Sequence, residues 1–179
     1  DCCDLIKAGN LVNIKNKTDD DVIEIDQEAN QVFEETILKS EYFYSFISEE
    51  NEDIKYNNNI TSKTKYMIAC DPIDGSKNID INITTGTIFT IFKLNSENKV
   101  KSGRDIVCSG YSLFGVCTQL IISTKDSTNI YQLNSDNEFT FVKEMSKMPN
   151  KSSSYSINQG YSNLWINPKI CKFVNNQME

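Results

Sequence analysis

The sequence predicts an α+β fold in which helices pack on a mostly antiparallel sheet. Between residues 22 and 39, apolar side chains recur every three or four positions, which is the spacing of an amphipathic helix. Shorter runs rich in β-branched and aromatic residues follow, separated by turn-forming residues, and such runs are typical of strands. Three of them, 118–123, 128–133 and 139–143, lie close enough in sequence to form an antiparallel meander.

The other elements are predicted from the same periodicities and from composition. In chain order they are a short helix at 1–13, a loop at 16–21 that leads to an N-cap, a strand at 42–48, an Asn-rich loop at 51–63, a strand at 66–70, a strand at 84–94, a tightly packed helix at 106–115, a turn at 134–137 and a linker-like segment at 148–154. The helix at 106–115 is inferred from the small residues Ser109 and Gly110 within an apolar stretch.

Composition and charge limit the classes of protein. The 179 residues are enough for one domain, predicted to span 1–179. The net charge of −7, with Arg104 as the single arginine, argues against a nucleic-acid binder, which needs a basic face. No run of about 18 apolar residues predicts a membrane span. No signal-like leader is present and the six cysteines lack C-x-x-C spacing, so we expect a cytoplasmic protein with free thiols.

The chain contains no histidine, and this excludes several kinds of active site. Ser-His-Asp and Cys-His catalysis and Cys/His zinc sites all need that residue. A Cys-x5-Arg phosphatase loop is excluded too, because Asn98 stands where its cysteine would be. Carboxylates, hydroxyls, amides and lysines remain for chemistry.

The central motif is an apolar run, 66–70, that delivers two acids into a turn. Asp71 and Asp74 are held close together because Pro72 restricts the backbone beside it and Gly75 permits a tight turn. Carboxylates forced together need a cation between them, and Mg²⁺ prefers such oxygen ligands. The Ile73 carbonyl could add an oxygen, and the following amides of Gly75, Ser76 and Lys77 could cradle an anion. An ordinary surface turn is the alternative interpretation.

Two further segments carry acids toward this turn. The strand at 42–48 ends in Glu49 and Glu50, so adjacent strand ends could bring these residues to Asp71 and Asp74. Asp26 lies on the buried side of the long helix, where an unpaired acid would be costly. A solvated Glu-Glu pair on the surface is the alternative for the first segment.

The segments Asp71–Ser76, Asn78–Asp80 and Gly86–Phe89 together resemble the signature of the fructose-1,6-bisphosphatase family, within the lithium-sensitive sugar and inositol phosphatases. The resemblance extends from about Lys15 to the region of Tyr161. It implies a layered α/β sandwich of the sugar-phosphatase type, of which this chain is mainly the N-terminal half, with the C-terminal domain absent. It also implies hydrolysis of the 1-phosphate of a sugar bisphosphate, fructose 1,6-bisphosphate above all. The reaction would depend on two or more Mg²⁺ ions, with Mn²⁺ or Zn²⁺ as other metals.

The resemblance assigns roles to residues that match the family motif. It implies metal ligands at Glu49, Asp71, the Ile73 carbonyl and Asp74; water activation by Asp20, Asp26 and Glu50; substrate binding by Asp74, Gly75, Ser76, Lys77, Asn158 and Tyr161; and an AMP inhibitor site at Lys65, Tyr66 and Arg104. Lys77 departs from the family, which commonly has Ser there. The family further implies a homo-oligomer, commonly a tetramer.

Three alternatives to the fructose enzyme stay open at this point. One is a sedoheptulose-1,7-bisphosphatase, whose core motif is alike, although Asn78 and the 158–161 segment favour fructose. A second is an inositol-phosphate phosphatase, and a third, of another class, is a truncated and inactive chain that binds metal or assembles with full-length subunits.

Overall fold

The computed structural model describes residues 11–15, 21–145, 150–152, 157, 160 and 167–178. The chain divides into two compact units, 1–146 and 147–179. The elements of the first unit are β1 (Leu11–Lys15), β2 (Asp21–Ile23), α2 (Glu24–Lys39), β3 (Phe43–Ser48), β4 (Lys55–Tyr56), β5 (Tyr66–Asp74), the 3-10 helix η1 (Ser76–Asn78), β6 (Thr85–Lys93), the 3-10 helix η2 (Gly103–Asp105), β7 (Ile106–Phe114), β8 (Thr118–Thr124), β9 (Thr128–Leu133) and β10 (Phe139–Glu144). The second unit contains α3 (Pro168–Met178), which begins with Asn167 capping the Lys169 amide at 3.0 Å and Pro168 in the first turn.

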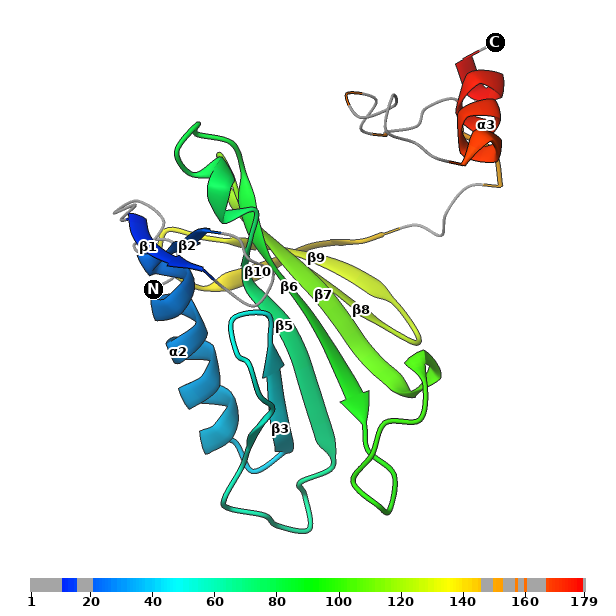
Figure 1. Ribbon diagram of the computed structural model, residues 1–179. Coiled ribbons are helices and arrows are strands. Elements are labelled where there is room, and N and C mark those ends of the chain that lie inside the picture. Colours follow the sequence, from blue (N-terminus) through cyan, green and yellow to red (C-terminus); the bar gives the residue numbers. More distant parts are fainter. Residues whose placement is uncertain are drawn as a thin grey trace. The chain divides into compact units, whose positions relative to one another are not determined.

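One twisted eight-stranded sheet dominates the first unit, in the order β10-β9-β8-β7-β6-β5-β3-β4 (Figure 1). Within it β3 and β5 are parallel and all other neighbours are antiparallel. Helix α2 packs against β3 and β5, so it covers one face of the sheet at this end. The predicted α+β class and the meander of β8, β9 and β10 are therefore confirmed. None of the described helices is long and apolar enough to cross a membrane.

The core lies between α2 and the central strands. Phe46 of β3 and Ile68 and Cys70 of β5 form its buried centre, and Phe46 is fully buried. The apolar stripe of α2, Phe33, Ile37 and Leu38, packs against them, as the periodicity of 22–39 predicts. The helix begins at Glu24 rather than at Val22, which lies in β2.

The prediction of a helix at 106–115 is wrong, because this segment is the strand β7. It pairs with β6 on one side and β8 on the other. Gly110 explains both the tight packing and the error: a Cβ there would meet the carbonyl of Ile121 and lie 2.7 Å from the Phe89 ring. The small residues therefore allow close approach within a sheet rather than between a helix and its neighbour.

The prediction of a helix at 1–13 is also wrong for residues 11–13, which belong to β1. Residues 1–10 lie outside the described part of the chain. β1 pairs antiparallel with β2, with Leu11 opposite Ile23. A partner strand supplied by the next segment decides this structure, and apolar spacing alone does not reveal such a partner.

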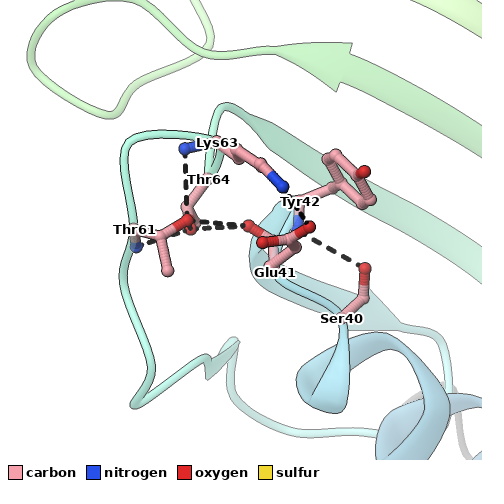
Figure 2. A network of polar contacts seen from close by, with 6 residues as sticks. All are labelled: Ser40, Glu41, Tyr42, Thr61, Lys63 and Thr64. Atoms are coloured by element: carbon pink, nitrogen blue, oxygen red, sulfur yellow. Dashed lines mark hydrogen bonds and ion pairs between the residues drawn. The ribbon is translucent and has the colours of Figure 1, made fainter.

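The connection from β3 back to the start of β5 is held by polar contacts at the end of α2. The predicted loop at 51–63 is irregular apart from the two-residue β4. Figure 2 shows how the loop meets the α2–β3 turn: Lys63 Nζ lies 2.7 Å from Glu41 Oε1, and the Thr64 hydroxyl donates to the Glu41 carbonyl at 2.8 Å. Buried Asn57 donates to the carbonyls of Ser40 at 2.9 Å and Phe43 at 3.0 Å. The return path is therefore anchored before β5 begins.

Candidate functional site

Parallel pairing brings Glu49 and Asp71 together. Ser48 of β3 is in register with Cys70 of β5, so the next residue of each strand lies at the same edge of the sheet. The Glu49 amide donates to the Cys70 carbonyl at 3.2 Å, and the carboxyl groups of Glu49 and Asp71 share a hydrogen bond. The convergence expected from the sequence is therefore present, although 21 residues separate the two acids in the chain.

The environment of Asp71 opposes its negative charge. Partial burial, the charge of Glu49, the hydrogen bond with Glu49 and the charge of Asp74 together raise the pKa of Asp71 to about 7. The Ile73 amide, which donates to Asp71 Oδ1 at 3.1 Å, acts in the opposite direction. An acid held in this way favours a proton or a cation beside it.

Cys70 does not contribute a ligand to this group. Burial and, to a smaller extent, the charge of Asp71 together raise the pKa of its thiol to about 12. The thiol therefore stays protonated at neutral pH, whereas a metal ligand or nucleophile must be a thiolate.

A β-bulge places Asp71 and Asp74 on one face of β5. Asp71 pairs with Ile88 and Asp74 with Gly86, so two residues of β5 oppose the single residue Thr87 of β6. In a regular strand, residues three apart would face opposite sides. Here Pro72 and Ile73 are both buried, and Asp74 returns to the exposed side. The predicted turn after residue 70 is thus a continuing strand with an extra residue.

A side chain of the neighbouring strand holds the bulge. The buried Thr87 hydroxyl donates to the Pro72 carbonyl at 2.8 Å. Because a bulge removes one residue from the regular ladder, the backbone at Ile73 lies where strand pairing is disrupted. This geometry is compatible with the expected role of the Ile73 carbonyl as an oxygen ligand.

A tight turn follows the bulge. Gly75 has φ 77°, a left-handed conformation that glycine adopts at little cost, and η1 starts directly after it. The amides of Asn78 and Ile79 donate to the carbonyls of Gly75 and Ser76. The amides of the expected anion cradle, those of Gly75, Ser76 and Lys77, lie at the start of this turn.

Asp26 and the Glu49–Glu50 turn are linked through α2. Asp26 lies in the first turn of α2 and is 3% exposed. One turn later, Asn30 Nδ2 donates to Asn51 Oδ1 at 2.9 Å, directly after Glu50. The contact from α2 to residue 51 was not predicted from the sequence. Polar residues in a loop rich in Asn gave no signal that one of them reaches the helix.

Other predicted site residues lie elsewhere or outside the description. Asp20, Asn158 and Tyr161 are outside the described residues. Lys65 and Tyr66 lie at the start of β5, the end opposite to Asp71 and Asp74. Arg104 lies in η2, which leads into β7 and contacts β6. The three expected AMP contacts therefore lie at the same end of the β5–β6–β7 part of the sheet. At a rise of about 3.3 Å per residue, Tyr66 is about 17 Å along β5 from Asp71 and about 26 Å from Asp74.

The described acids offer the type of ligand that a hard cation prefers, although they do not form a complete coordination shell. Among the described residues, no group of three Asp, Glu or Cys side chains meets the geometry of a metal site. Glu49 and Asp71 are in direct contact, and Asp74 is near enough to disfavour the charge of Asp71. All their donor atoms are oxygens, the ligands that Mg²⁺ prefers.

The first unit also contains an apolar cavity of about 390 Å³. It is lined by Phe33 of α2 and by residues of the sheet, Phe89, Phe114 and Phe139 among them. None of the acids discussed above lines it. The charged site is thus at the end of the β3–β5 pair rather than in this hollow.

Comparisons with known proteins identify relatives over nearly the whole chain. A family model described as "Fructose-1-6-bisphosphatase, N-terminal domain" matches residues 3–144. Fructose-1,6-bisphosphatase of Schizosaccharomyces pombe is 33% identical over 178 residues, which are 96% of this chain and 50% of that protein. The class 1 enzyme of Halorhodospira halophila is 31% identical over 92% of this chain and 53% of its own length.

Solved structures agree with this result. The holo form of Leishmania major fructose-1,6-bisphosphatase superposes with a TM-score of 0.86 at 25% identity, covering 97% of this chain and 59% of that one. The T-state structure of the same enzyme gives a TM-score of 0.74 at 27% identity, covering 85% and 51%. The chain spans about half the length of the curated relatives it matches.

Proposed function

Because the chain belongs to the fructose-1,6-bisphosphatase family, we propose that it serves in hydrolysing the 1-phosphate of fructose 1,6-bisphosphate to give fructose 6-phosphate and phosphate. This reaction belongs to gluconeogenesis. The observation that supports it most is the hydrogen-bonded pair of Glu49 and Asp71, with Asp74 beside it on the same face of β5. Three acids drawn together in this way suit a site that binds a cation and a phosphate ester.

Members of this family depend on metal ions, and we propose Mg²⁺ for this chain. Glu49, Asp71, Asp74 and the Ile73 carbonyl would hold it. When bound, such an ion neutralises charge on the phosphate and lowers the pKa of water. The proposal agrees with the raised pKa of Asp71, since a cation would relieve the repulsion that raises it.

The chain's own residues would orient and deprotonate water and hold the phosphate. Asp20, Asp26 and Glu50 would accept the proton of the attacking water, a role for which carboxylates are suited. The amides of Gly75, Ser76 and Lys77 would donate hydrogen bonds to the phosphoryl oxygens as they gain charge. Asn158 and Tyr161 would bind the distal phosphate.

Regulation and assembly are proposed on the family relationship alone. Lys65, Tyr66 and Arg104 would bind AMP as an inhibitor, remote from the acids, and the protein would act as a tetramer in the cytoplasm. One solved structure of the Leishmania major enzyme is described as its T-state, and this supports the proposal that the family is regulated.

The first test replaces Asp74 with Asn. Because the change removes a proposed ligand charge, Mg²⁺ affinity measured by calorimetry should fall by more than about tenfold, since even residues around a ligand shell are worth 10–100-fold. Release of phosphate from fructose 1,6-bisphosphate should fall with it. Asp126→Asn, an exposed acid in the turn between β8 and β9, is the matched control and should change neither quantity.

The same assay distinguishes the substrate. Purified protein is offered fructose 1,6-bisphosphate, sedoheptulose 1,7-bisphosphate and inositol phosphate in parallel. Preference for either of the latter two would overturn the fructose assignment. Unchanged Mg²⁺ affinity in Asp74→Asn would overturn the metal site itself.

A further inference from the structure

Glu49 and Glu50 are the two central residues of a closed turn. The Asn51 amide donates to the Ser48 carbonyl at 3.3 Å, and the Ser48 hydroxyl accepts from the Glu50 amide at 3.3 Å. The Glu49 amide is bonded to Cys70 of β5, so the first half of the turn is fixed to the sheet. What fixes the second half is the side chain of Asn51.

The Asn51 carboxamide joins this turn to α2 with two hydrogen bonds. Its Oδ1 accepts from Asn30 Nδ2 at 2.9 Å, and its Nδ2 donates to Glu34 Oε2 at 3.2 Å. Asn30 and Glu34 are four residues apart and share one face of the helix, and Asp26 precedes them by one more turn in the same row. Asn51 thus connects the segment that carries two acids of the site to the helix that carries a third.

The chemistry of the contact is specific to an amide. A carboxamide offers a donor and an acceptor together, whereas a carboxylate of the same shape can only accept. Asn30 is itself 9% exposed, and no described group donates to its buried Oδ1. A buried acceptor without a hydrogen bond lowers stability. Packing alone therefore does not explain an asparagine at position 30.

We propose that Asn51, held by Asn30 and Glu34, is a positioning residue that sets the metal affinity of the acidic site by fixing the Glu49–Glu50 turn relative to Asp26. The inference rests on the proposed function, because it takes the acids to bind a divalent ion. Without the tether, the turn can pivot about the end of β3. The acids are then in place in a smaller fraction of molecules, and the apparent affinity falls by that fraction.

The test is a charge-balanced pair of variants examined by Mg²⁺ calorimetry and by the Mg²⁺ dependence of phosphate release. Asn51→Asp sets a carboxylate against Glu34, so the tether should break and Mg²⁺ affinity should fall about 10–100-fold, the range for residues that orient ligands. If the added charge alone decided the result, Asn51→Asp would bind Mg²⁺ more tightly, because a negative charge attracts the cation. Adding Glu34→Gln restores a donor and the parent's net charge, and should restore the parent's affinity.

Asn57→Ala is the control for a purely structural asparagine. Asn57 is buried and bonded to backbone carbonyls at the other end of β3, so its loss should lower the thermal midpoint and leave Mg²⁺ affinity unchanged. Asn51→Ala, which adds no charge, should weaken Mg²⁺ binding with a drop in midpoint no larger than that of Asn57→Ala.

The outcomes separate this inference from the function on which it rests. If the parent protein binds no Mg²⁺, the proposed metal site fails and the positioning role fails with it. If the parent binds Mg²⁺ while Asn51→Asp binds it equally or more tightly, or the double variant does not recover, the positioning role alone is overturned.

Discussion

Asp71 is held in a place where its ionised form is disfavoured. Its pKa of about 7 compares with an ordinary value of 3.8, so the folded protein takes up a proton that the unfolded chain has already released at that pH. The stability cost of ionising Asp71 is therefore absent near pH 4, grows as pH rises toward 7 and is complete above it. An acid that lowers stability and lies in contact with other acids is best explained by what the acids bind.

Asp71→Asn should therefore stabilise the metal-free protein while abolishing its response to metal. The amide keeps the shape and removes the repulsion with Glu49 and Asp74. In thermal unfolding with EDTA, the variant's midpoint should exceed that of the parent at pH 8, and the difference should vanish as pH falls to 4. Asp126→Asn should show no such pH-dependent difference. A lower midpoint for Asp71→Asn at pH 8 would contradict the electrostatic account.

At the scale of single elements, β7 depends on close approach at Gly110. Gly110→Ala should destabilise the protein by about 1–3 kcal/mol, the usual cost of overpacking, because its Cβ would meet the Ile121 carbonyl and the Phe89 ring. Gly103→Ala, whose Cβ would meet no atom within 4 Å, is the matched control and should be nearly neutral. Urea titrations measure both, and equal effects would mean that the strand can shift to accept a methyl group.

The sequence predicted most elements but not how some of them pair. The spacing in 22–39 and the composition of 118–143 correctly indicated α2 and the meander, because one apolar face and short turns leave a local signal. β7 was predicted as a helix because small residues such as Ser109 and Gly110 allow close packing both between helices and within a sheet. Their presence in the sequence does not distinguish the two structures. The identity of the crowding neighbours, Phe89 and Ile121, is set by tertiary structure.

The site was predicted in part for the same reason. Strand ends carrying acids are visible in the sequence, so the meeting of Glu49 and Asp71 could be expected. The bulge that returns Asp74 to the face of Asp71 could not be predicted. It depends on the neighbouring strand, where the single residue Thr87 lies opposite two residues of β5 and donates a hydrogen bond to one of them. The link from Asn51 to Asn30 depends on the packing of α2 against β3.

For the whole molecule, metal binding should appear as stability of the fold. Ligand that binds only the native state adds about 2.7 kcal/mol to the free energy of unfolding when present at 100 times its dissociation constant. We therefore expect Mg²⁺ to raise the thermal midpoint and excess EDTA to reverse the rise. Sodium chloride at the same ionic strength is the control for screening of the net charge of −7. An equal rise with sodium would mean that screening, not a site, is responsible.

The parallel pairing of β3 and β5 has a consequence for engineering. Because β3 and β5 are parallel, the chain must return to the opposite end of the sheet before β5 starts. The position where Glu49 and Asp71 meet is set by the register of the two strands and not by the length of this return path. Its tip near Ile60 is exposed, and the contacts of Asn57 and Thr64 anchor it on both sides. A peptide tag or fluorescent reporter grafted at that tip should leave the acids undisturbed.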